Sequence, residues 1–208
     1  THNRCGGAVL SPAQMATIKA IADRHGLFVH LDGARIFNAA VALGIDVKEI
    51  AAQADSIQLC FSKGLAAPVG SAICGSADFI REARRNRKIV GGGMRQAGII
   101  AAAAIVALEQ MVDRLADDHE NARRLAAGLA EMDGVAIDPA TVQTNIVVFG
   151  LTNPAISLPQ VSQALAAKGI KINPIDSRHF RAVTHYGIER EDIDRALIAL
   201  RETLAELT

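Results

Sequence analysis

The stretch "LCFSKGLAAPVG", residues 59–70, leads from an apolar run directly into a lysine that small residues follow. The run "DSIQLCF", residues 55–61, predicts a buried strand that ends at Ser62 and Lys63. Glycine, alanine and proline then occupy positions where polar loop residues are usual. Because side chains of this size leave the backbone open to close approach, the stretch indicates a lysine placed beside another group.

The sequence on both sides of this stretch alternates between helical and extended patterns. The run "LFVHLD", residues 27–32, predicts a buried strand that ends at an acid, and residues 70–76 predict another strand. Ser11 and Pro12 form a helix start, with the serine as cap and the proline at the first helical position. The expected helices lie at residues 12–25, 33–44, 77–89 and about 95–130. This alternation favours an α/β fold with parallel strands.

The pattern changes beyond about residue 130. Short strands and helices there predict a small α/β domain with an antiparallel sheet. Strands are expected at residues 134–138, 144–150, 170–174 and 180–185, and helices at 159–168 and 189–207. The long helix before them is expected to connect the two parts, with a kink between Leu115 and His119. We therefore expect domains at residues 1–115 and 116–208.

Composition and charge exclude several classes of protein. The 208 residues carry 22 basic and 22 acidic side chains, so the basic excess of a nucleic-acid-binding protein is absent. No apolar run reaches the roughly 18 residues of a membrane span, and no signal peptide is visible. The three cysteines lack metal-ligand spacing, and Cys60 and Cys74 are expected to act as small hydrophobic residues in strands. An odd number of cysteines favours the reducing cytoplasm.

Two charged residues follow two of the predicted strands. Asp32 ends one strand and Lys63 ends another, and ligands of open α/β sheets bind outside the carboxyl ends of the strands. The spacing alone is also compatible with a structural ion pair or with two solvent-facing charges. A cofactor explains the pair better, because pyridoxal phosphate needs a lysine amine for a Schiff base and an acid that keeps its pyridine nitrogen protonated.

Four segments carry a resemblance to a known family. The segments "HLDGARIFNAA", "SKGLAAPVGS", "GGGMRQAG" and "FRAVTH" occur in this order, after the opening "THNRCGG". Together they resemble the low-specificity threonine aldolases, pyridoxal-phosphate enzymes of the aspartate-aminotransferase-like fold, over essentially the whole chain. The resemblance implies the C-terminal part of a fold type I large domain at residues 1–115 and a small C-terminal domain at 116–208.

The resemblance also implies a role for five residues. Lys63 would be the Schiff-base lysine, and Asp32 would pair with the pyridine nitrogen. Arg35 would lie at the cofactor and help to hold the substrate carboxylate, and Arg181 would be the second carboxylate-binding arginine. Arg95 would reach the cofactor phosphate of a neighbouring subunit in a homodimer or homotetramer. From the residues alone, the arginines also fit a helix face, a strand or the basic cluster at 81–88.

The reaction that the resemblance implies is the cleavage of L-threonine or L-allo-threonine to glycine and acetaldehyde. The complete enzymes are longer on the amino-terminal side, which supplies a phosphate-binding turn and a side chain stacked on the cofactor. We therefore expect this chain to be the carboxy-terminal part of an aldolase. The alternatives are a non-catalytic remnant and a pyridoxal-phosphate-dependent β-eliminating lyase on the same fold.

One departure from the family and several histidines complete the expectations. Ala66 stands where the family usually has glycine, which costs little unless its φ is positive. His30 is expected in the core, and His25 and His119 on helix surfaces. His2 lies in the opening loop, where it is a candidate for approaching the cofactor.

Overall fold

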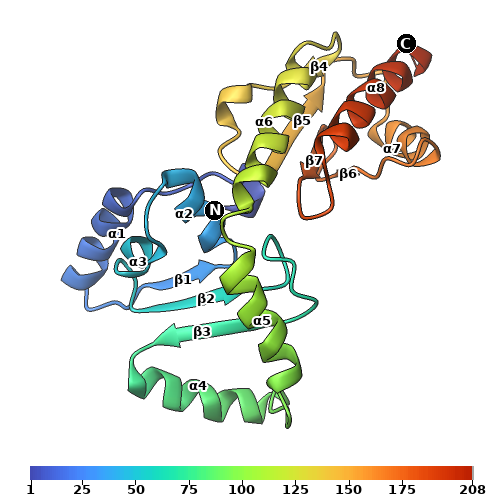
Figure 1. The fold of residues 1–208 in the computed structure, drawn as a ribbon. Helices are drawn as coiled ribbons and strands as arrows, with labels where there is room; N and C mark the ends of the chain where they lie inside the picture. Colours follow the sequence, from blue (N-terminus) through green and yellow to red (C-terminus); the bar gives the residue numbers. More distant parts are fainter. Residues whose placement is uncertain (208) are drawn as a thin grey trace. The chain divides into compact units, whose positions relative to one another are not determined.

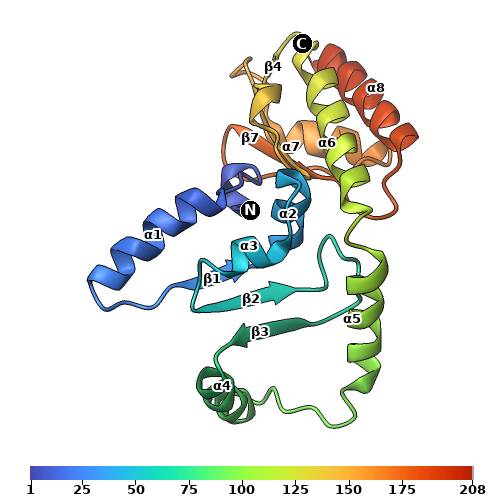
Figure 2. The same ribbon diagram turned by 60° about the vertical axis from the view of Figure 1, so that its left-hand side comes forward.

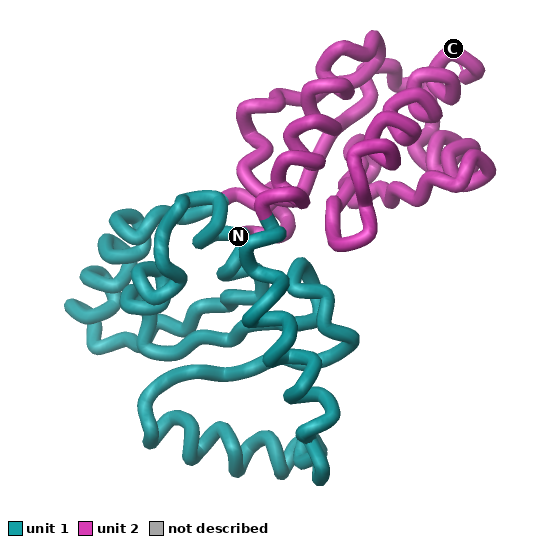
Figure 3. Tube along the Cα trace, viewed as in Figure 1, with its two compact units in different colours: residues 1, 9–115 teal, residues 2–8, 116–208 magenta. Residues whose placement is uncertain are grey.

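A computed structural model describes residues 1–207, which form two compact units. Unit 1 consists of Thr1 and residues 9–115, and unit 2 consists of residues 2–8 and the described residues from 116 onward (Figure 3). The opening segment 2–8 therefore belongs to unit 2, whereas the predicted domain at residues 1–115 includes it. No helix in the described part of the chain combines the length and apolarity that a membrane crossing needs.

Unit 1 contains a three-stranded sheet in the order β1-β2-β3. The strands are β1 His30–Gly33, β2 Ser56–Cys60 and β3 Ser71–Gly75. The first pair is parallel, as predicted, but β3 runs antiparallel to β2. The prediction of parallel strands is wrong for this second pair. The loop between β2 and β3 is shorter than the roughly dozen residues that a parallel crossover requires.

Three helices cover one face of this sheet (Figures 1 and 2). They are α1 Pro12–Arg24, α2 Ile36–Leu43 and α3 Val47–Ala51. The α1 start is a complete capping box, in which Ser11 and Gln14 satisfy each other's backbone N–H groups, so the predicted cap is confirmed. Met15, Ile36 and Ile57 bring α1, α2 and β2 into one buried cluster.

Several apolar side chains in the strands of unit 1, or just before them, are less buried than predicted. The side chains of Leu27 and Phe28 are 61% and 89% exposed, and β1 begins only at His30. Cys74 in β3 is exposed, and Cys60 in β2 is only half-buried. The sequence pattern here is apolar, but within residues 1–207 no element covers these side chains.

Helix α4, Ala77–Ile89, has the predicted bounds, and the predicted long helix is two separate helices. They are α5 Gly98–Gln110 and α6 Leu115–Ala130. The break at 111–114 comes before the predicted kink between Leu115 and His119. The break includes a β-branched residue and an aspartate, Val112 and Asp113, which are weak helix formers.

Unit 2 contains an antiparallel four-stranded sheet in the order β4-β5-β7-β6, which confirms the predicted sheet type. Its strands are β4 Val135–Ala136, β5 Ile146–Leu151, β6 Asn173–Pro174 and β7 His179–Val183. Its remaining elements are η1 Asn3–Cys5, η2 Pro139–Thr141, α6, α7 Leu158–Ala167 and α8 Arg190–Leu207. The three α-helices and the sheet enclose one large core, in which Phe149 and Phe180 stack with ring centroids 5.4 Å apart.

Candidate functional site

Asp32 and Lys63 lie toward the C-terminal ends of two adjacent strands of the unit 1 sheet. These strand ends form one edge of the sheet. Strands β1 and β2 are parallel, with Asp32 opposite Gln58 and Gly33 opposite Leu59. Asp32 is the third residue of β1, and Lys63 lies just beyond the end of β2. Both residues are exposed. Asp32 therefore lies near the carboxyl end of β1 and Lys63 beyond the carboxyl end of the parallel strand β2, where ligands of open α/β sheets bind.

The turn after β1 holds Asp32 in place and leads into α2. The Asp32 Oδ1 atom accepts a hydrogen bond of 3.1 Å from the Ala34 N–H. A Cβ atom at Gly33 would lie 2.8 Å from the Gln58 carbonyl oxygen, so only glycine fits beside β2. Arg35 occupies the N-cap position of α2 and is half-buried.

Thr1 shares this edge with Asp32 and Arg35. Thr1 lies close enough to Arg35 and Asp32 for the charges of both side chains to act on it. The Thr1 hydroxyl oxygen is buried without a hydrogen-bond partner among the described residues. A buried hydroxyl of this kind normally has a hydrogen-bond partner, so the Thr1 hydroxyl is available to a further polar group.

Lys63 lies on a loop that backbone hydrogen bonds hold closed. The Phe61 N–H donates to the Gly70 carbonyl at 3.0 Å, and the Ala66 N–H donates to the Lys63 carbonyl at 2.9 Å. The loop buries Leu65 and exposes the lysine. The β2–β3 connection therefore presents the amine from an anchored backbone.

Two of the small residues after Lys63 are restricted, Gly64 by close packing and Ala66 by its backbone conformation. A Cβ atom at Gly64 would lie 2.9 Å from a methyl group of Leu115 and 3.1 Å from the Asn38 side-chain oxygen. The atoms that pack against the Gly64 backbone therefore belong to the protein itself, in the side chains of Leu115 and Asn38. Ala66 has φ +57°, which is the one condition under which alanine in place of the family's glycine is costly.

The other two predicted arginines lie elsewhere in the fold. Arg95 is exposed in the turn before α5 in unit 1. Arg181 belongs to unit 2, where it lies in β7 opposite Val148 of β5 and Asn173 of β6. The structure thus brings Asp32, Arg35 and Lys63 to one edge of unit 1, and it places Arg181 on the sheet of unit 2.

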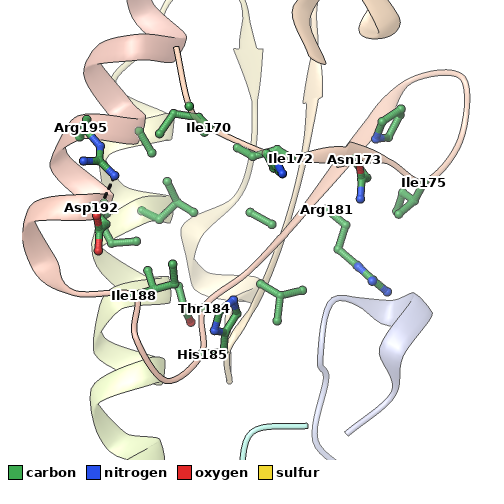
Figure 4. Close-up of a pocket in the computed structure, with 18 residues that line it drawn as sticks. Ile170, Ile172, Asn173, Ile175, Arg181, Thr184, His185, Ile188, Asp192 and Arg195 are labelled. Atoms are coloured by element: carbon green, nitrogen blue, oxygen red, sulfur yellow. Dashed lines mark hydrogen bonds and ion pairs between the residues drawn. The ribbon is translucent and has the colours of Figure 1, made fainter. Parts of the chain in front are cut away.

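Arg181 borders a cavity of about 450 Å³ in unit 2. Five isoleucines, Ile170, Ile172, Ile175, Ile188 and Ile193, contribute to its wall, and Asp192 and Arg195 form an ion pair beside it (Figure 4). The guanidinium of Arg181 is turned away from the isoleucines, toward the segment 2–8 (Figure 4). Its Nη1 atom donates a hydrogen bond of 2.9 Å to the Asn3 side-chain oxygen.

The sequence does not indicate a role for Asn3, and two histidines lie elsewhere than predicted. The Asn3 contact joins residues 178 positions apart, so no local pattern indicates it. His30 is exposed rather than in the core, and its Nδ1 lies 2.8 Å from the Ser56 hydroxyl. His119 is buried rather than on a surface, and burial, with a smaller effect of the Arg123 charge, lowers its pKa to about 4. The neighbouring charged residues of α6 gave His119 the sequence context of a surface residue.

Residues 1–151 match the profile of the beta-eliminating lyase family. The low specificity L-threonine aldolase of Escherichia coli strain K12 is 41% identical over 207 residues, which cover 99% of this chain and 59% of that protein. Low-specificity L-threonine aldolase 1 of Arabidopsis thaliana is 40% identical over 205 residues, which cover 98% of this chain and 57% of that protein. These identities confirm the resemblance found in the sequence, and the chain spans a little over half the length of these curated relatives.

Solved structures establish the fold. The threonine aldolase of Leishmania major superposes with a TM-score of 0.74 at 19% identity, over 94% of this chain and 56% of that one. A serine palmitoyltransferase of Sphingomonas wittichii gives 0.73 at 20% identity, over 95% and 52%. The predicted fold class, that of the fold type I pyridoxal-phosphate enzymes, is thereby confirmed. With the profile match over residues 1–151, the chain belongs to the beta-eliminating lyase family.

Proposed function

We propose that the protein to which this chain belongs is a pyridoxal-phosphate-dependent aldolase that cleaves L-threonine or L-allo-threonine to glycine and acetaldehyde. The observation that carries the proposal is the position of Asp32 and Lys63 at one edge of the parallel pair β1–β2. The names of the relatives that match nearly the whole chain support the same reaction.

The donor set at this edge fits pyridoxal phosphate. Lys63 offers a primary amine that can hold the cofactor covalently, and Asp32 offers a carboxylate for the pyridine nitrogen. The buried Thr1 hydroxyl offers a polar atom with no partner among the described residues. When bound, pyridoxal phosphate supplies an electron sink for the substrate carbon that loses its bond.

The arginines would bind and orient the amino-acid substrate. A guanidinium fork matches a planar carboxylate, which suits both Arg35 and Arg181. Holding the carboxylate fixes the substrate so that the bond between Cα and Cβ is the one that breaks. Asp32 would pair with the pyridine nitrogen, where a carboxylate charge stabilises the protonated ring.

Further parts of the proposal concern the whole protein. Arg95 would contact the cofactor phosphate of a neighbouring copy, which makes the protein a homodimer or homotetramer. Residues outside this chain would supply the phosphate-binding turn and a side chain stacked on the cofactor ring. The cytoplasm is the proposed compartment, since Cys5, Cys60 and Cys74 are all free thiols.

A β-elimination on the same site is the second candidate, which the family profile favours. The two reactions differ in their products. Aldol cleavage of L-allo-threonine gives glycine and acetaldehyde, whereas β-elimination gives a 2-oxo acid and ammonia. A non-catalytic remnant would give neither.

The test measures these products with two polypeptides and excess pyridoxal phosphate. The polypeptide of the complete reading frame is expected to release acetaldehyde at about 1–10³ per second, and the 208-residue chain alone far more slowly. A Lys63→Ala variant of the complete polypeptide is the control for cofactor-dependent turnover. Ammonia in place of acetaldehyde would favour the lyase. Full turnover by the 208-residue chain would show that no further residues are needed.

A further inference from the structure

The segment 2–8 forms a closed loop that is fixed to the sheet of unit 2. The His2 N–H donates to the Ala8 carbonyl at 3.0 Å, and the Gly7 N–H donates to the His2 carbonyl at 3.0 Å. The buried Thr144 hydroxyl donates to the Gly7 carbonyl at 2.9 Å. A Cβ atom at Gly7, which has φ +76°, would overlap the Thr144 hydroxyl. The loop is therefore anchored at the start of β5 and has a defined position on unit 2.

This anchored loop carries the hydrogen-bond acceptor for Arg181. Asn3 lies in η1, within the loop, and its side-chain oxygen accepts the hydrogen bond from Arg181 Nη1. Arg181 itself is half-buried in the middle of β7. Both ends of this hydrogen bond are thus held by the fold, so the guanidinium has a preset direction.

The chemical nature of the acceptor matters for what Arg181 can bind. An amide oxygen is neutral, so it orients the guanidinium without cancelling its charge. A guanidinium has five N–H donors, and one bond to Asn3 leaves a pair of them for a bidentate contact with an anion. A carboxylate at the same place would pair with the arginine and repel a carboxylate ligand.

We propose that Asn3 is a positioning residue, which aims the Arg181 guanidinium at the substrate carboxylate while leaving its charge available. The proposal rests on the proposed function, in which Arg181 binds that carboxylate. It assigns the opening segment a part in substrate affinity, in addition to its packing against β5.

The test compares Asn3→Ala and Asn3→Asp in the complete, cofactor-loaded protein. Asn3→Ala is expected to raise KM for L-allo-threonine about tenfold with little change in kcat, because the lost hydrogen bond serves binding throughout the reaction. Asn3→Asp is expected to raise KM further, roughly a hundredfold, because the new carboxylate competes with the substrate for Arg181. Cofactor affinity should not change in either variant.

Thermal stability separates positioning from a merely structural role. If Asn3 has only a structural role, a variant should lose substrate affinity only to the extent that its Tm falls. Positioning predicts that Asn3→Asp keeps or raises Tm, through its new pair with Arg181, while it weakens substrate binding most. Asn173→Ala is the matched control, since Asn173 also lies opposite Arg181. In an Arg181→Lys background, the Asn3→Ala effect on KM should largely disappear.

The positioning role of Asn3 and the proposed aldolase activity can fail separately, and the outcomes distinguish the two failures. If the protein cleaves L-allo-threonine and both Asn3 variants keep KM within twofold, the positioning role is overturned and the aldolase stands. If the protein cleaves no threonine, calorimetric binding of glycine still tests Asn3. A weakened affinity for glycine in Asn3→Asp would then support the positioning role by itself, and an unchanged affinity would overturn it.

Discussion

The two units differ in how completely their sheets are covered. In unit 2, the central strand residues Val147, Phe149 and Phe180 are at most 1% exposed, inside a core that three helices complete. In unit 1, four of the five β3 residues are exposed, and within residues 1–207 the helix α4 has no buried side chain. Phe28 and Ile99 are 89% and 77% exposed.

The candidate residues for two different tasks lie in different units. Unit 2 has a closed core of its own, and it carries the carboxylate-binding candidate Arg181. Unit 1 carries Lys63 and Asp32 on a sheet whose apolar surface is only partly covered, and surfaces of this kind normally contact a further partner. We therefore expect cofactor chemistry to depend on unit 1 together with additional chain, and substrate affinity to depend on unit 2.

The largest expected effect is on cofactor binding by unit 1, and it is compared with substrate binding by unit 2. In the complete protein, Lys63→Ala should abolish the visible absorbance of bound cofactor and lower turnover by at least about a thousandfold, because the covalent attachment point is lost. Arg181→Lys should keep that absorbance and weaken threonine binding, because lysine does not reproduce the bidentate fork. Absorbance titration and steady-state kinetics measure both. A borohydride-trappable adduct that persists in Lys63→Ala would contradict the assignment.

A pair of core substitutions tests the difference in coverage. Phe180→Ala in unit 2 should lower the free energy of unfolding by about 3–5 kcal/mol, as expected for a fully buried aromatic ring. Ile73→Ala in β3 of unit 1, where the side chain is 44% exposed, should cost less than about 1 kcal/mol in the 208-residue chain. Denaturant titration provides both values. If Ile73→Ala costs clearly more in the complete protein, additional chain covers β3 there.

The pH dependence of stability should reveal the closed core of unit 2 through His119. Its pKa in the folded state, about 4, lies below the unfolded value of 6.5. The folded state therefore binds fewer protons, and stability that is fully present above pH 6.5 is lost as the pH falls toward 4. The expected loss is up to about 3 kcal/mol.

Urea titrations of the chain at several pH values measure this loss. His119→Gln should flatten the profile between pH 6.5 and 4, because glutamine does not titrate. Asp176, whose pKa is lowered from 3.8 mainly by the hydrogen bond from the Arg178 N–H, loses its contribution only below that window. An unchanged profile in His119→Gln would show that another group titrates there.

The smallest expected effect concerns the Lys63 loop of unit 1. Ala66→Gly should raise the free energy of unfolding by about 0.5–1 kcal/mol, because glycine adopts φ +57° without the strain of a Cβ atom. Ala67→Gly is the matched control, since Ala67 is buried and has no positive φ, and it should destabilise. Thermal unfolding of the 208-residue chain measures the two shifts. Equal destabilisation by both variants would mean that the loop relaxes without strain.

Local patterns were sufficient for most helices and strands. The Ser11 cap, the end of β2 before Lys63 and the bounds of α4 follow from signals within a few residues of each element. The direction of β3 and the break at 111–114 were predicted wrongly. The direction of β3 depends on the length of the loop between β2 and β3. The break at 111–114 depends on small differences in helix propensity.

The sequence by itself determined the elements, the family resemblance and the position of Asp32 and Lys63 at strand ends, because each depends on residues that are close in the chain. Only the tertiary structure decided that residues 2–8 pack in unit 2, that Asn3 meets Arg181 and that His119 is buried. Burial and long-range contacts depend on which elements pack together. Residues separated by more than a hundred positions carry no local signal of their contact.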